Sequence, residues 1–166
     1  MERRHAGGAA IFGLAAVIIV FLLRDGMTGR EAPDFSLREA YGGQVQLQSL
    51  RGRPVLLVFW TTSCGICRHE LPVLDRLAEE FRGRGVEMLA INLGDLEGAR
   101  QYMRENHLNL TTLVDTDGIV GQKYNVNGVP KLVLVGADGR IKRAHAGMQS
   151  ERTMRQWLES VTPARS

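Results

Sequence analysis

Two apolar runs in the middle of the chain predict the centre of a sheet. Residues 55–60 carry only apolar side chains and residues 86–91 nearly so, which is typical of strands covered on both faces. Between these runs, apolar residues recur at helical spacing from Leu71 to Phe81, with charged residues on the opposite side. This pattern predicts a helix, and Pro72 within it is expected to kink it.

Weaker patterns before and after this centre predict further elements. Apolar and polar residues alternate over Val45–Leu50, which predicts a half-buried strand. The other predicted elements, in chain order, are a charged helix over about 95–107, a short helix near 119–124, a hairpin of strands 131–135 and 141–146, and a last helix after an N-cap at Ser150. This order predicts an α/β fold with a central mixed sheet, parallel in one part and antiparallel at one edge, flanked by helices.

The composition fits one globular domain and narrows the range of partners. Of 166 residues, 44% are hydrophobic and 23% are charged, which is ordinary for a domain with a sizeable core. The formal net charge is only +3, and no run of five or six basic residues occurs. We therefore expect no nucleic-acid partner, since such proteins carry concentrated basic patches.

The N-terminal segment has the pattern of a membrane anchor. Residues 6–23 carry no charge, and as a helix they would extend about 27 Å, close to the roughly 30 Å of a bilayer's hydrocarbon core. The arginines before this stretch are expected to stay in the cytoplasm. We predict a retained transmembrane signal anchor over 1–24, a linker over 25–31, and a domain over 32–162 on the extracytoplasmic, periplasmic side of the cytoplasmic membrane.

Other interpretations of this segment fit less well. A cleaved signal peptide is the main alternative, although the exit from the apolar stretch has no Ala-x-Ala pattern. A lipoprotein would need a cysteine there, and a buried helix of a soluble domain would need a polar face to meet solvent, which this stretch lacks. Retained or cleaved, the segment directs the domain out of the cytoplasm, where a disulfide persists.

Cys64 and Cys67 are the only cysteines, and they lie where the predicted buried strand passes into the predicted helix. Exposed amides at a helix N-terminus stabilise a thiolate and lower the thiol's pKa. Cys64 is therefore expected to be the attacking nucleophile. Cys67, one helical turn further on and facing inward, is within reach to resolve a mixed disulfide. The pair predicts thiol–disulfide exchange.

Metal binding and a purely structural disulfide are the competing interpretations of the pair. Zinc usually needs four ligands, and only His69 stands nearby, because the other histidines show no ligand spacing. Copper accepts two thiolates and stays open as an interpretation. A structural disulfide that closes so small a loop would add little stability. We expect no resident metal and no cofactor beyond the cysteine pair itself.

Several segments resemble one known family in matching order. They are APDFSL at 32–37, LRGRPVLL at 50–57, FWTTSCGICRHELP at 59–72 and GVP at 128–130. Together they resemble the membrane-anchored, thioredoxin-like thiol-disulfide oxidoreductases of the TlpA/ResA kind, within the redoxin or AhpC-TSA superfamily. The resemblance covers about residues 31–161 and implies a thioredoxin-like fold and protein-disulfide oxidoreductase activity.

The resemblance assigns roles to residues around the cysteine pair. Cys64 matches the attacking cysteine and Cys67 the resolving one, so the two are expected to form a redox-active disulfide. Glu70 matches an acidic residue that assists proton transfer in some members, whereas on the helix pattern alone it would be a solvated charge. Pro72 matches a helix-kinking proline.

The resemblance also assigns three positions to substrate contact. Pro130 matches a cis-proline that faces the cysteine pair, so the Val129–Pro130 bond is expected to be cis. The backbone of Val129 would then pair with an extended segment of the client protein. Trp60 matches the aromatic residue at the end of the central strand, and core packing is the alternative role for it.

The chain departs from the family pattern at four positions. Ser63 stands where tryptophan is usual before the first cysteine, and Ile66 where proline is usual before the second. Lys131 follows the expected cis-proline, where threonine is common. Val58 occupies the position of a buried acid in ordinary thioredoxins, which leaves the proton acceptor for Cys67 open.

The combined interpretation is an extracytoplasmic thiol-disulfide oxidoreductase that reduces client proteins with cysteine pairs. The family implies apocytochrome c or copper-site precursors as clients and a membrane thiol–disulfide carrier as electron donor. A peroxidase is one alternative, because residues 32–37 also resemble the start of peroxiredoxins and Thr61-x-x-Cys64 mimics part of their site, although Leu57 stands where they have proline. The other alternative is a copper-relay protein that uses the same cysteines.

Overall fold

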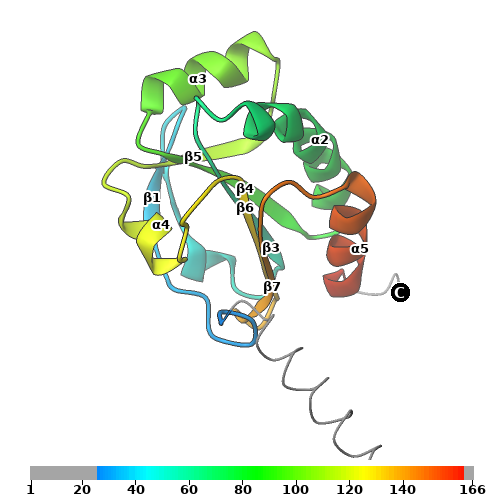
Figure 1. The fold of residues 1–166 in the computed structure, drawn as a ribbon. Coiled ribbons are helices and arrows are strands. Elements are labelled where there is room, and N and C mark those ends of the chain that lie inside the picture. The colour runs from blue at the N-terminus through cyan, green and yellow to red at the C-terminus, as the bar shows by residue number, and fades with distance from the viewer. Residues whose placement is uncertain (1–25, 163–166) are drawn as a thin grey trace, which may run out of the picture.

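The computed structural model describes residues 26–162, which form a seven-stranded sheet with helices on both faces (Figure 1). In spatial order the strands run β2-β1-β5-β4-β3-β6-β7. Their bounds are β1 Ser36–Glu39, β2 Gln44–Gln46, β3 Val55–Trp60, β4 Glu87–Leu93, β5 Thr111–Asp115, β6 Lys131–Val135 and β7 Ile141–Ala146. The helices are α2 Gly65–Arg82, α3 Leu96–Glu105, α4 Ile119–Lys123 and α5 Glu151–Val161, and η1 Leu47–Leu50 is a 3-10 helix.

The sheet is mixed, as predicted. Strands β3, β4 and β5 pair in parallel, whereas β6 and β7 on one side and β1 and β2 on the other pair antiparallel. Helices α2, α3 and α5 cover one face of the sheet, and α4 covers the other (Figure 1). The parallel part follows from the helical crossovers, because a parallel pair needs a connection that returns to the starting end of the sheet.

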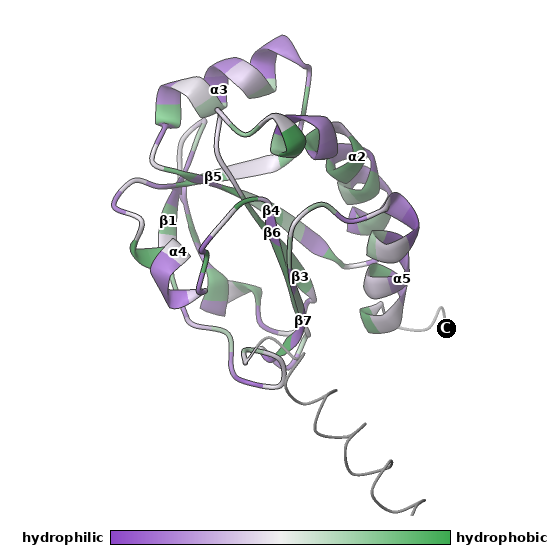
Figure 2. Ribbon diagram, in the orientation of Figure 1, coloured by the Kyte–Doolittle hydropathy of each residue, from purple (hydrophilic) through white to green (hydrophobic). Residues whose placement is uncertain are grey.

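Strand β3 is buried at every position, which confirms the prediction from its unbroken apolar run. Val58 and Trp60 face the layer of α2, while Leu57 and Phe59 face the layer of α4. Figure 2 shows hydrophobic colouring along the central strands and alternating colouring on α2 and α5. Because both faces of β3 are packed, its carboxyl end is a firmly held point from which α2 starts.

The predicted strand over 45–50 is wrong in its second half. Only Gln44–Gln46 is a strand, and Leu47–Leu50 is the 3-10 helix η1. The side chains of Leu47 and Leu50 are both buried, and a 3-10 turn brings residues three apart to the same side. A carboxylate oxygen of Asp34 accepts a hydrogen bond from the Gln48 amide at 3.0 Å, which holds this turn. Strand β1 was not predicted.

Residues 26–31, interpreted from the sequence as part of a linker, lie against the domain. The side chain of Met27 is 5% exposed, and the Gly29 amide donates to the Ile141 carbonyl at 2.7 Å. Glu31 forms an isolated bridge with Arg140. The predicted anchor over 1–24 lies outside the described residues, and within 26–162 no helix has the length and apolar character to cross a membrane.

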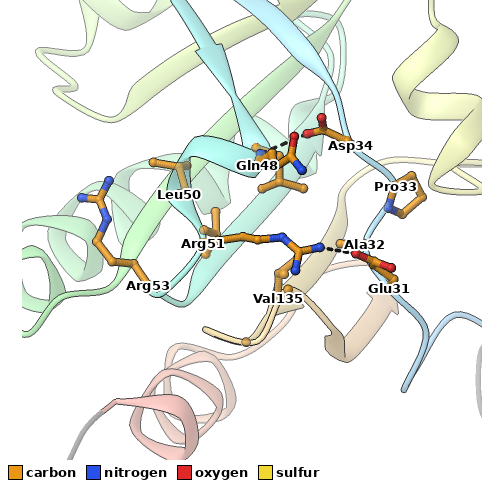
Figure 3. A pocket seen from close by; sticks show the side chains of 13 residues that line it. Glu31, Ala32, Pro33, Asp34, Gln48, Leu50, Arg51, Arg53 and Val135 are labelled. Atoms are coloured by element: carbon orange, nitrogen blue, oxygen red, sulfur yellow. Dashed lines mark hydrogen bonds and ion pairs between the residues drawn. The ribbon is translucent and has the colours of Figure 1, made fainter.

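A pocket of about 360 Å³ lies at the amino end of β3. Val55, the first residue of the strand, lines it together with Val135, and an ion pair between Arg51 and Glu31 stands beside it (Figure 3). The length of β3 is about 17 Å at roughly 3.4 Å per residue, and the cysteines follow the other end of the strand. The pocket is therefore separate from the cysteine site.

We expect Asp115→Ala to lower the free energy of unfolding by about 2–4 kcal/mol, because two buried hydrogen bonds to a carboxylate are lost. The Asp115 side chain is fully buried and accepts from the amides of Val120 (3.2 Å) and Gly121 (2.7 Å), which start α4. Urea denaturation measures the change. Asp117→Ala removes an exposed contact to the Ile119 amide and is the matched control, with an expected loss of at most about 1 kcal/mol.

Candidate active site

The cysteine pair stands at the junction of β3 and α2. Cys64 is the N-cap of α2, and its Sγ accepts a hydrogen bond from the Cys67 amide at 3.1 Å. The two cysteines form a disulfide, with their Cα atoms 5.2 Å apart. Cys67 is 1% exposed, whereas Cys64 is partly exposed, so Cys64 is the sulfur that another molecule can reach. This arrangement agrees with the roles expected for the attacking and resolving cysteines.

The loop between α4 and β6 faces the pair. The Val129–Pro130 peptide bond is cis, as expected from the resemblance. The Val129 carbonyl oxygen lies 3.8 Å from Cys64 Sγ, although the two residues are 65 positions apart in the chain. On the other side of the loop, the Gly147 amide donates to the Pro130 carbonyl at 2.7 Å. The folded chain therefore brings the predicted substrate-contact backbone next to the reactive sulfur.

Glu70 is buried rather than solvated. Its side chain is 2% exposed, and Oε1 accepts a hydrogen bond from the Gln149 amide at 2.9 Å. Within residues 26–162, no hydrogen-bond partner contacts Oε2. Loss of solvent raises the pKa of Glu70, and the Gln149 hydrogen bond offsets part of that rise. Glu70 follows Cys67 by one helical turn, so a carboxyl group with a raised pKa lies close to the resolving cysteine.

Trp60 lies in the core and offers no surface to a substrate. Its side chain is fully buried, and its ring centroid is 5.7 Å from that of Tyr102 in α3. The Tyr102 hydroxyl donates to the Arg68 carbonyl at 2.6 Å, so the same aromatic pair also ties the start of α2 to α3. Direct substrate contact by Trp60 is thus not supported, because packing between the helices encloses the ring, and the alternative role in the core agrees with the structure.

The sequence patterns did not reveal two contacts that hold the site. The Thr62 hydroxyl donates to an Asp95 carboxylate oxygen at 2.8 Å, and the other oxygen accepts from the Gly98 amide at 2.9 Å. These hydrogen bonds, the Gly98 bond first, lower the pKa of Asp95. The second contact is that of Gln149 with Glu70. The predicted N-cap at Ser150 located the start of α5 but could not indicate which buried carboxyl group the preceding amide contacts.

Metal ligands do not gather around the pair in the part of the chain that the structure describes. Across residues 26–162, no three side chains of histidine, cysteine, aspartate or glutamate are grouped so as to hold a metal ion. His69 follows the pair on α2 and is exposed. The chemistry that the observed arrangement supports directly is that of the two sulfurs.

A redox-active disulfide at the start of a helix, facing a cis-proline loop, defines a thiol-disulfide oxidoreductase. The chain belongs to the AhpC/TSA family, whose sequence pattern matches residues 28–144. Its fold is thioredoxin-like. A candidate thiol:disulfide interchange protein DsbE from Chlorobium tepidum superposes with a TM-score of 0.76 at 26% identity, over 81% of this chain and 96% of that one.

Other relatives agree with this assignment. The thiol-disulfide oxidoreductase ResA of Bacillus subtilis is 29% identical over 136 residues, which are 81% of this chain and 76% of the relative. ResA of Geobacillus thermodenitrificans is 31% identical over 81% of this chain and 78% of its own length. A secreted Mycobacterium tuberculosis disulfide oxidoreductase has a TM-score of 0.66 at 28% identity, over 76% of this chain and 95% of its own. This protein is accordingly a protein-disulfide oxidoreductase of the ResA/DsbE type.

We expect Glu70→Gln to stabilise the oxidised protein increasingly as the pH rises. Because burial raises the pKa of Glu70, the folded state keeps its proton at a pH where the unfolded state has lost it, and stability falls as pH rises through this interval. Glutamine does not ionise, so the variant avoids this loss of stability. The loss is about 1.4 kcal/mol for each unit by which folding raises the pKa of the glutamate.

Urea denaturation from acid to neutral pH measures the difference between this variant and the unaltered protein. Glu79→Gln removes an exposed carboxylate from the same helix and is the matched control. If the free energy of unfolding of Glu70→Gln changed with pH in the same way as that of the control, the expectation would be contradicted.

Proposed function

We propose that this oxidoreductase reduces disulfides in client proteins. The observation that supports this proposal is the contrast between the two cysteines. The partly exposed Cys64 faces the Val129 carbonyl, whereas Cys67 is buried. One sulfur is therefore accessible to a client and the other only to its partner. This asymmetry suits a two-step exchange, in which an accessible thiolate attacks first and a protected thiol resolves.

The exchange transfers two electrons from the cysteine pair to the client. The Cys64 thiolate attacks one sulfur of the client disulfide, forming a mixed disulfide and releasing the other client sulfur as a thiolate that takes up a proton. The Cys67 thiolate then attacks Cys64 Sγ, which releases the second client sulfur and forms the Cys64–Cys67 disulfide. An external dithiol, itself oxidised to a disulfide, returns the pair to its reduced form.

The start of α2 favours the first step. The Cys67 amide points at Cys64 Sγ at 3.1 Å and is one of the helix N-terminal donors that have no partner within the helix. Such donors, together with the helix dipole, stabilise negative charge on the sulfur. A stabilised thiolate is both the attacking species and a better leaving group when the pair is reduced again.

Glu70 is the group that we assign to proton transfer at Cys67. Val58 stands at the position of the buried acid in ordinary thioredoxins, so that strand supplies no carboxyl group. Glu70 is buried, lies one helical turn from Cys67, and has a pKa that burial raises, which suits a group that takes and returns a proton. In this assignment its carboxylate accepts the Cys67 proton before the resolving attack.

Anchoring and clients are the finer parts of the proposal. The uncharged stretch at 6–23 supports a retained transmembrane anchor, with the domain on the periplasmic side. The electron donor would then be a thiol–disulfide carrier of the same membrane. Apocytochrome c and copper-site precursors are the client classes that we propose, because the resemblance to the TlpA/ResA kind implies them.

We expect Cys67→Ala to accumulate a mixed disulfide with a client, because Cys64 can still attack while nothing resolves the product. Purified full-length variant is incubated with insulin, and adducts are measured by mass spectrometry without reductant. Cys64→Ala is the matched control and should trap none. Adducts equally abundant in both variants, or absent from both, would contradict the assignment, and peroxide consumption or copper retention by the unaltered protein would then favour the alternative functions.

We expect the reduction potential of the Cys64–Cys67 couple to lie near or below about −200 mV, the range of thiol reductants. Equilibration against glutathione or dithiothreitol, followed by mass spectrometry of alkylated thiols, measures it. A potential near about −120 mV, which is typical of a disulfide donor, would reverse the proposed direction of electron flow.

A further inference from the structure

Lys131 is a buried cation at the start of the strand that follows the cis-proline loop. It is the first residue of β6 and follows Pro130 directly. Its side chain is 5% exposed, and among residues 26–162 it is the only buried lysine or arginine. Burial of a charged group is costly without compensating contacts, so the contacts of the Lys131 ammonium indicate its role in the structure.

The Lys131 ammonium joins two segments that lie far apart in the chain. Nζ donates to the Asn125 carbonyl at 3.1 Å, and it lies 3.9 Å from the Met27 sulfur. Asn125 adopts a left-handed backbone conformation with φ 50°, just after the end of α4. Met27 belongs to the N-terminal segment and is itself buried. The cation therefore lies between that segment and the exit from α4.

The hydrogen bond to Asn125 closes a ring that contains the cis-proline loop. Residues 125–131 run from the accepting carbonyl to the donating side chain, so both ends of the loop are tied together. Within this ring lies Val129, whose carbonyl oxygen is 3.8 Å from Cys64 Sγ. The Gly147 amide holds the Pro130 carbonyl from the outer side at 2.7 Å. Lys131 and Gly147 thus each hold a backbone carbonyl of the segment that contains Val129.

We propose that Lys131 is a positioning residue, whose ammonium holds the loop 125–130 in the shape that receives a polypeptide client. The inference rests on the proposed function, in which the Val129 backbone pairs with an extended client segment. A loop that is already ordered loses less conformational entropy when the client binds. The contribution of Lys131 therefore belongs to client binding, and a small disulfide that makes no backbone contact does not use it.

The experiment compares a polypeptide disulfide with a small one. Full-length protein in detergent reduces insulin or hydroxyethyl disulfide with dithiothreitol as electron donor. For Lys131→Met we expect the KM for insulin to rise about tenfold, with kcat and the rate with hydroxyethyl disulfide changed less than twofold. Lys131→Arg keeps a donor and should restore most of the loss.

Lys123→Met is the matched control. Lys123 also donates to a backbone carbonyl, that of Asp34 at 3.3 Å, but it is exposed on α4. We expect less than a twofold change in either assay. Lys131→Gln, whose side chain is polar but shorter, replaces Lys131→Met under the same criterion if the latter does not fold.

Two results would overturn the inference. One is an unchanged KM for insulin in Lys131→Met. The other is a parallel loss with both disulfides that follows a lower thermal midpoint, because that pattern belongs to a role in the fold alone. If the unaltered protein reduces neither disulfide, the proposed function itself fails, which separates the two hypotheses.

Discussion

The burial of β3 on both faces is the constraint on which the site depends. All six residues of this strand are enclosed between the layers of α2 and α4, so its carboxyl end has little freedom to move. The chain then turns and starts α2 within a few residues, which places Cys64 at the N-cap. The reactive sulfur lies next to helix amides that have no partner within the helix, because the rigid strand fixes where the helix starts.

Around this point, contacts between distant segments complete the site. The Val129 carbonyl comes from the loop before β6, and the amide that binds Glu70 precedes α5. In each contact, a polar group that is hidden from water is paired with, or lies close to, a group from another part of the chain. Burial without such partners would be costly, so the same contacts that hold the fold also set the environment of the two sulfurs.

Much of the architecture could be predicted because it depends on local patterns. The central strand β3, the helix α2, the hairpin of β6 and β7, and the N-cap of α5 agree with the structure. The second half of the strand predicted over Val45–Leu50 was wrong, because Leu47 and Leu50 lie three positions apart, a spacing that puts both on one side of a 3-10 turn but on opposite faces of a strand. Trp60 was matched to substrate contact, but packing against Tyr102 encloses it.

By itself, the sequence determined the chemistry: two cysteines three positions apart, at the end of an apolar strand and the start of an amphipathic helix. The resemblance to the TlpA/ResA kind, rather than any local pattern, indicated that Pro130 would face them. Only the tertiary structure decided the surroundings of Glu70 and Lys131, whose hydrogen-bond partners Gln149 and Asn125 are not visible in any local pattern. Periodicity and capping reflect interactions over a few residues, whereas the environment of a buried charge depends on which distant segments fold around it.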